Sequence, residues 1–366
     1  MRLEEIKLRD FRNYEALSLS FEPGVNLIVG DNAQGKTNLL EAIAYLGSGK
    51  SFRAQRVSEM VRFGADFADL EGSVWSQERQ QSLRWVLFSG ARPRQIWRNG
   101  AKKKTAADIH GVMSTVLFCP EDLYILKSGA SERRRLGDTV LCQLRPNYDA
   151  ALSEYYRILE QKSRILKDHF ENPAVLEILP EYNARLCQVG ALLISYRARF
   201  YESLGKAAQI YHDSFSGGKE EFSLEYKTVS TVTDPFATVS ELNQALLAHL
   251  DSHYRAELET GQCLTGPHKD DFSVSLSGID LKAYGSQGQT RTAAISLKLA
   301  QRELMKRETG EEPVLLLDDV LSELDPGRQD FVLNQIVSGQ VFITCCEPGR
   351  FTKLGKTIQI EKGKVK

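Results

Sequence analysis

The sequence lacks the marks of several protein classes. Its six cysteines form no C-x-x-C pair and have no histidines at zinc spacing, so we expect neither a disulfide framework nor a zinc site. No apolar run approaches the roughly 18 residues that cross a bilayer. The first residues, Met1–Lys7, are charged and contain no apolar segment, so we expect no signal peptide and a cytoplasmic protein. Cys345 and Cys346 adjoin in an apolar stretch, and we interpret them as reduced core residues.

The sequence also has no excess of positive charge, because it contains 47 Lys and Arg and 48 Asp and Glu. Nucleic-acid binding would therefore need a local basic surface. Residues 79–105 hold eight basic residues, no acidic residue, and both Trp85 and Trp97. This segment is either a strip that contacts DNA phosphates or a solvated hairpin face. The candidate DNA contacts in it are Arg92, Arg94, Arg98, Lys102, Lys103 and Lys104.

Short apolar and alternating segments predict an α/β core with an antiparallel flank. We expect antiparallel strands at 6–8 and 17–21, and a strand at 25–29 followed by a helix at 36–46. Further strands are expected at 85–88 and 95–98. Asn99-Gly100 then predicts a type I′ hairpin turn.

The middle of the chain changes to helical patterns from about residue 132 to 211. A heptad-like seam there is consistent with an antiparallel helical arm, and equally with a plain buried helix in a bundle. A strand-like segment at 222–226 and one more helix follow, and the α/β pattern returns near Thr265. The seam consists of Tyr182, Leu186, Val189, Leu193, Tyr196, Phe200 and Leu204.

The segment 30–37 fits the phosphate-loop pattern G-x-x-x-x-G-K-[ST] between a strand and a helix. Its glycines let the backbone N–H groups point at phosphate oxygens, and the helix N-terminus adds partial positive charge. Lys36 would neutralise the β- and γ-phosphates of ATP, and the Thr37 hydroxyl would bind Mg²⁺. The expected ATP contacts here are Gly30, Asp31, Asn32, Ala33, Gln34, Gly35, Lys36, Thr37 and Asn38.

A second motif is the apolar run 313–317, which predicts a central parallel strand and ends in Asp318-Asp319. At such a strand end, Asp318 would hold Mg²⁺ through water and Asp319 would orient the attacking water. With Lys36, these are the expected catalytic residues.

A third motif, Ser286-Gln287-Gly288-Gln289, precedes a helix expected at 290–306. Alone it indicates a helix cap or an anion site. Together with the phosphate loop, Asp318-Asp319 and the segment 322–325 (S-E-L-D), it resembles ABC-type ATPases of the SMC and Rad50 class. This resemblance implies that Ser286, Gly288 and Gln289 touch the γ-phosphate held by a second subunit, and so a homodimer around two ATP molecules.

Four further segments, 8–14, 118–123, 265–271 and 315–325, resemble the RecF family and span nearly the whole chain. The resemblance implies an ABC-type ATPase head split by a short helical arm, with Arg12 and Asn13 near the nucleotide phosphates. It divides the chain into head residues 1–120, an arm at 121–260 and head residues 261–366. It also implies a role in DNA repair on double-stranded or gapped DNA, with a RecR-like recombination mediator as partner. For the basic segment, it favours contact with DNA.

Two departures from the wider ABC pattern argue against fast hydrolysis. Asp319 stands where most ABC ATPases carry the longer Glu, and 345–347 lack the histidine of many transporters. We therefore expect a slow, DNA-stimulated ATPase in which ATP sets the lifetime of the dimer. His268 is either a catalytic or DNA-contacting group or a satisfied loop histidine, and we favour the structural role.

Two other function classes share the phosphate loop. An ABC transporter subunit would couple ATP to a membrane partner, but the helical insertion and the basic segment argue against it. A small-molecule kinase needs no contact from a second subunit, so the S-x-G-Q motif argues against that class.

Overall fold

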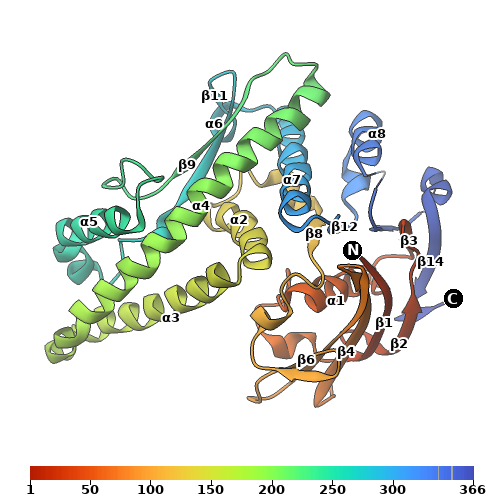
Figure 1. Cartoon of the computed structure of the whole chain (residues 1–366), viewed down its shortest axis with the longest axis horizontal. Helices are drawn as coiled ribbons and strands as arrows, with labels where there is room; N and C mark the ends of the chain where they lie inside the picture. The colour runs from red at the N-terminus through yellow and green to blue at the C-terminus, as the bar shows by residue number, and fades with distance from the viewer. Residues whose placement is uncertain (337, 348) are drawn as a thin grey trace. The chain divides into compact units, whose positions relative to one another are not determined.

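The computed structural model describes residues 1–336, 338–347 and 349–366. The chain folds into two compact units, the first made of residues 1–123 and 298–366 and the second of residues 124–297 (Figure 1). Among the described residues, no helix combines the length and apolar composition needed to cross a membrane.

One sheet of the first unit is antiparallel, with strand order β2-β1-β4-β5-β6-β7. The expected turn at Asn99-Gly100 is confirmed, since both residues have positive φ, 51° and 75°. The expected antiparallel pair of N-terminal strands is also confirmed. The strands are β1 (Arg2–Phe11), β2 (Tyr14–Ser20), β4 (Phe67–Ser76), β5 (Arg79–Phe88), β6 (Gln95–Arg98) and β7 (Ala101–Lys103).

The other sheet of this unit has the order β15-β14-β3-β13-β12-β8, and its strands from β14 to β8 run parallel. As predicted, β12 is a buried central strand, paired on one side with β13 and on the other with β8. The carboxyl ends of β3, β13 and β12 therefore lie side by side. The strands are β3 (Val25–Val29), β8 (Thr115–Phe118), β12 (Val314–Leu317), β13 (Val341–Cys345), β14 (Gly355–Glu361) and β15 (Lys364–Val365).

Helix α1 (Lys36–Ser48) shares one apolar core with both sheets. Its Leu39, Leu40 and Ile43 are fully buried in this core. At its C-terminal end the Trp85 indole N–H donates to the carbonyl of Leu46 at 3.0 Å. The helix that begins at the phosphate loop is thus fixed along its length. The unit also contains α8 (Pro326–Gln335) and short 3₁₀ helices at Val57–Met60, Ala106–Ile109, Val320–Glu323 and Gly349–Leu354.

The second unit is a helical bundle beside a three-stranded sheet of order β11-β10-β9. Figure 1 shows α4 running along this unit beside α3. The elements are α2 (Ala130–Leu144), α3 (Pro146–Asp168), α4 (Leu179–Ser216), β9 (Phe222–Lys227), α5 (Val239–Thr260), β10 (Asp271–Leu276), β11 (Ile279–Asp280) and α6 (Leu281–Tyr284). Two 3₁₀ helices cover Pro173–Ile178 and Pro267–Lys269, a third crosses the unit boundary at Pro120–Tyr124, and α7 (Gln287–Thr309) does so as well.

The heptad-like seam lies on α4, a helix of 38 residues. This helix packs against α3, α5 and β9, and it buries side chains outside the seam, such as Cys187, Ile194 and Tyr201. A helix covered on several sides packs as the core helix of a bundle, and this bundle forms the inserted helical arm unit. The bundle interpretation is therefore the one that the structure supports.

The helical unit ends at residue 297, whereas the sequence predicts that the helical arm ends at residue 260. Strand β10 pairs with β9, and two buried arginines tie residues 270 and 271 to the helices. Arg197 on α4 bonds to Asp270 at 2.8 Å, and Arg133 on α2 bonds to Asp271 at 2.6 Å. These ion pairs hold the start of β10 against the helices, in line with the assignment of residues 261–297 to the helical unit.

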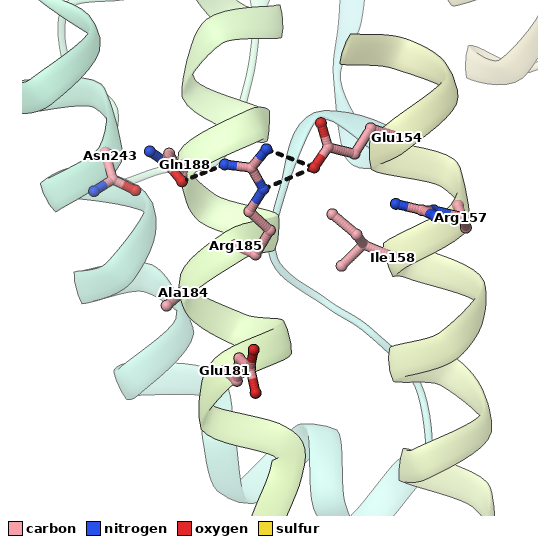
Figure 2. A pocket seen from close by; sticks show the side chains of 8 residues that line it. All are labelled: Glu154, Arg157, Ile158, Glu181, Ala184, Arg185, Gln188 and Asn243. Carbon is pink, nitrogen blue, oxygen red and sulfur yellow. Dashed lines mark hydrogen bonds and ion pairs between the residues drawn. The ribbon is translucent and has the colours of Figure 1, made fainter. Parts of the chain in front are cut away.

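A hollow of about 670 Å³ lies in this unit among α3, α4 and α5 (Figure 2). Arg185 spans it and donates to Glu154 and to Gln188, both at 2.7 Å. Arg157 and Glu181 complete a balanced set of two cations and two anions. Because its charges balance within the lining, this hollow offers no surplus positive charge for phosphate.

Candidate nucleotide-binding site

The phosphate loop needs glycine at both ends for steric reasons. A Cβ on Gly30 would lie 2.3 Å from the carbonyl oxygen of Ile360, and Gly35 has φ +118°. The Cβ of any other residue at position 35 would also lie 2.7 Å from the side chain of Asn13. Strand β14 and the turn between β1 and β2 therefore lie close against the loop, and glycine alone fits at both positions.

The Lys36 side chain lies inside this loop. Its ammonium donates to the carbonyl of Gly30 at 2.7 Å and to that of Asp31 at 3.1 Å. Lys36 is only 3% exposed, so its charge is held next to the loop backbone. Such a charge can bind phosphate oxygens with little loss of side-chain entropy on binding.

Three side chains connect the phosphate loop with the carboxylate strand. The Thr37 hydroxyl donates to Asp318 Oδ1 at 3.0 Å, and the Thr344 hydroxyl donates to the same oxygen at 2.8 Å. Burial raises the pKa of Asp318, and these two hydroxyl bonds oppose that rise. Thr344 lies on β13, which stands in the sheet between β12, the strand that Asp318 follows, and β3, the strand that precedes the phosphate loop.

The donor atoms at this junction suit a hard cation. Thr37 and Asp318 offer oxygens, the ligands that Mg²⁺ prefers, and Mg²⁺ in nucleotide sites uses one or two protein ligands with phosphates and water. Among the described residues, no three His, Cys, Asp or Glu side chains gather into a metal site. The oxygens of Thr37 and Asp318 themselves fit a magnesium ion that also binds nucleotide phosphates.

Asp319, the expected base, has a left-handed backbone with φ 50°. Its N–H donates to the Thr344 hydroxyl at 2.8 Å, and its carbonyl accepts from the Ser322 hydroxyl. These bonds stabilise a conformation that Asp adopts more readily than most residues. With this conformation the chain turns directly after Asp318, at the end of β12.

Asn13, in the turn between β1 and β2, contacts the phosphate loop. Its amide donates to the Gln34 carbonyl at 2.9 Å and its oxygen accepts from Asn38 at 2.8 Å. Arg12 instead forms a bidentate ion pair with the buried Glu41 of α1, at 2.7 and 2.8 Å. Arg12 thus anchors the turn to the helix, beside the nucleotide loop.

Cys346 is not the core residue that we expected, because it is exposed. Its sulfur lies 3.6 Å from Lys36 Nζ and 3.1 Å from Asn32 Oδ1. Cys345 is partly buried, and burial raises its pKa to about 11. The error arose because the strand ends at Cys345, so the apolar run continues one residue past the sheet.

Sequence reasoning also missed Arg53 and Thr344. The Arg53 guanidinium donates to the side-chain oxygen of Asn38 at 3.0 Å, and its charge lowers the pKa of Asp318 against the effect of burial. No motif marks Arg53. A polar Thr344 at the end of an apolar strand was the available signal, but its use requires the strand order.

The S-x-G-Q motif forms the start of α7. The Ser286 hydroxyl accepts from the Gln289 N–H at 3.2 Å, and the Ser286 N–H donates to the Gln289 side chain at 3.1 Å. This reciprocal pair is a capping box. Since the Ser286 oxygen accepts a bond, its own proton is directed elsewhere and can serve an anion. Downstream, Asp325 of the S-E-L-D segment caps α8.

The basic segment does not present all its charges on one face. Arg84 and Lys102 lie over the Trp97 ring on one face, at 5.3 and 5.8 Å. By strand alternation Arg98 and Lys103 belong to the opposite face. Arg92, Lys102 and Lys104 are exposed, Lys103 is half-buried, and Arg94 and Arg98 donate to Tyr45 and Gln81.

His268 has both ring nitrogens engaged. Nδ1 bonds to the Tyr155 hydroxyl at 2.7 Å and Nε2 to the carbonyl of Cys263 at 3.1 Å. Burial lowers the pKa of His268 to about 4, so the ring is neutral at pH 7. The structure supports the satisfied, structural histidine.

Comparison with known proteins gives matches over the full chain. The family model for the RecF/RecN/SMC N-terminal domain matches residues 2–366. The chain is 39% identical to the DNA replication and repair protein RecF of Agathobacter rectalis, over 100% of this chain and 99% of that one. It is similar, with a TM-score of 0.91 and 34% identity, to the solved structure of the recombination mediator protein RecF-ATPrS in the RecFOR pathway, covering 100% of this chain and 97% of that one.

A more distant likeness concerns the fold alone. The Smc head domain from Pyrococcus furiosus matches with a TM-score of 0.55 at 17% identity, over 100% of this chain and 95% of that one. The expected ABC-type ATPase head fold is therefore confirmed.

Proposed function

Because the chain belongs to the RecF/RecN/SMC N-terminal family, we propose that it is an ATP-dependent DNA-binding protein of recombinational repair and replication. It binds ATP and hydrolyses it slowly. Two copies dimerise around two ATP molecules on double-stranded or gapped DNA in the cytoplasm. A RecR-like mediator is the proposed protein partner, in line with a close structural relative described as a recombination mediator of the RecFOR pathway.

The observation that carries the proposal is the bond from Thr37 to Asp318. It brings the helix start that follows the phosphate loop to the carboxylate strand, which is the arrangement that ATP with Mg²⁺ requires. In this proposal the loop N–H groups and Lys36 bind the β- and γ-phosphates. Thr37 and Asp318 hold Mg²⁺, which when bound neutralises phosphate charge.

Hydrolysis is assigned to Asp319. Its carboxylate would orient a water for attack on the γ-phosphate, and the Ser286 hydroxyl and Gly288 N–H of the second subunit would bind the phosphate from the other side. Because the second subunit completes the site, ATP binding favours the dimer and hydrolysis ends it. Asp is shorter than Glu, so it reaches less far toward the water, which supports a slow rate.

DNA contact is assigned to the exposed cations Arg92, Lys102 and Lys104, with Lys103 beside them. Arg94 and Arg98 already donate to side chains of the protein, so we give them a role in holding the hairpin. These contacts would be to phosphate and independent of sequence.

The experiment that tests the function measures duplex DNA affinity with ATP, with ADP and without nucleotide. The proposal predicts tight binding only with ATP, and a rise in ATPase rate when DNA is added. Equal DNA affinity in all three conditions would contradict a role for ATP as the switch.

A further inference from the structure

One acidic side chain outside every recognised motif contacts the S-x-G-Q motif. Glu220 Oε1 accepts from the Gln289 side-chain amide at 2.8 Å. Its other oxygen, Oε2, bonds to His212 Nε2 at 3.0 Å. His212 lies in the last turns of α4 and is fully buried, with its ring against Phe222. The three side chains form a chain of bonds from the core of the helical unit to the motif.

The backbone holds Glu220 in place from both sides. On one side, α4 is followed by Gly217 and Gly218, which have φ 68° and 70° and whose N–H groups both bond to the Asp213 carbonyl. On the other side, the Glu221 carbonyl accepts from the Ser277 N–H at 2.8 Å. The backbone is therefore anchored within three residues of Glu220 on each side, and the bonds to His212 and Gln289 hold its carboxylate.

A carboxylate only accepts hydrogen bonds, so it determines which end of the Gln289 amide faces it. The NH₂ group must point to Glu220, and the oxygen then points to the Ser286 N–H, where it accepts at 3.1 Å. The same turn brings the Gln289 N–H to the Ser286 hydroxyl. Without Glu220 the amide can rotate by half a turn, and the capping box loses one of its two bonds.

We propose that Glu220 is a positioning residue, which fixes the Gln289 amide and through it the Ser286 hydroxyl for contact with the partner subunit's γ-phosphate. This role rests on the proposed ATP-dependent dimer. The His212 bond connects Glu220 to the C-terminal part of α4. Glu220 itself touches no phosphate.

The first test uses the protein without nucleotide and measures backbone hydrogen exchange at residues 286–290. Glu220→Ala should speed exchange of these amides by about tenfold, since a bond to a charged group is lost. Glu220→Gln keeps an oxygen for Gln289 and, after a change of His212 tautomer, a donor for Nε2, so it should stay within about threefold of wild type. Glu221→Ala, an exposed neighbour with the same change in charge, is the matched control. Unchanged exchange in Glu220→Ala would overturn the positioning role.

The second test measures ATP-dependent dimerisation and monomer ATP affinity in the same variants. Glu220→Ala should weaken dimerisation by about tenfold and leave ATP affinity within about twofold, and a Glu220→Ala/Gln289→Ala double variant should be no worse than Gln289→Ala alone. Wild-type dimerisation by Glu220→Ala would overturn the inference while the dimer itself stands. If the wild type does not dimerise with ATP, the proposed function fails, and hydrogen exchange still decides whether Glu220 orders the turn.

Discussion

Thr37 and Asp318 are separated by 281 positions in the sequence, yet the Thr37 hydroxyl donates to Asp318 Oδ1 at 3.0 Å. The bond joins the helix that follows the phosphate loop to the end of β12, across the intervening strand β13. Thr344 of β13 donates to the same oxygen. Every step of the proposed ATP chemistry depends on this junction.

Lys36→Ala should lower ATP affinity by on the order of a hundredfold or more, because two charge-assisted phosphate bonds contribute about 3 kcal/mol. The fold should persist, with a melting temperature within about 4 °C of wild type. Nucleotide titration and thermal unfolding measure the two effects. Lys7→Ala, an exposed lysine of the same unit, is the control. Near-normal ATP affinity in Lys36→Ala would contradict the phosphate-loop assignment.

Removing the charges of Lys102, Lys103 and Lys104 by substitution with Gln should weaken duplex binding equally for all sequences. The slope of log affinity against log salt should flatten by up to about 0.9 for each lysine–phosphate interaction that the substitutions remove. Lys364→Gln, on β15 of the same unit, should leave the slope unchanged. If the triple variant also keeps the wild-type slope, the segment is only a solvated face.

Asp319→Asn should keep the shape of the site and remove the base. Hydrolysis should fall by roughly 10²–10⁴, or about 3–5 kcal/mol of barrier. ATP affinity should hardly change, since the phosphates are bound elsewhere, so the variant should remain on DNA longer than wild type. Asp318→Asn should instead weaken Mg²⁺-dependent binding. The measurements are the rates of single-turnover hydrolysis and of dissociation from DNA. If both rates in Asp319→Asn equal those of wild type, Asp319 is not the base.

His268 should make stability depend on pH. Its pKa falls from 6.5 in the unfolded chain to about 4 in the folded protein, so the unfolded state binds more protons between these values. The contribution is present above about pH 6.5 and is lost as the pH falls toward 4. Between pH 7 and 4.5, His268→Gln should lose less stability than wild type, by on the order of 2 kcal/mol. Chemical denaturation at the two pH values measures both losses. If wild type and His268→Gln lose the same amount of stability, His268 is not the source of the pH dependence.

The sequence was most informative where chemistry restricts a short segment. The phosphate loop needs glycine at 30 and 35, and Asn99-Gly100 suits a turn with two positive φ angles, so both could be predicted from local sequence. The apolar run before Asp318 likewise predicted a central strand. The prediction that Cys346 is a core residue was wrong, because periodicity does not mark the residue at which a strand leaves the sheet.

Interactions between distant segments could not be predicted in the same way. The role of Thr344 depends on the position of β13 between β3 and β12, and strand order is a property of the whole sheet. The surroundings of α4 depend on which helices cover it, which a heptad-like pattern does not specify. Glu220 belongs to no motif, and its bond to Gln289 spans 69 positions.

The most direct test of the composite ATP site is complementation between two inactive variants, followed by sedimentation with and without ATP. Lys36→Ala lacks the phosphate lysine, and Ser286→Arg puts a bulky side chain where the partner's phosphate would lie. Neither should dimerise alone, although Ser286→Arg should still bind ATP. Mixed, the two variants hold one intact site, made of Lys36 from one subunit and Ser286 from the other. The account predicts that ATP converts the mixture to a heterodimer with one intact ATP site; a mixture that stays monomeric, or dimerisation of Ser286→Arg alone, would contradict it.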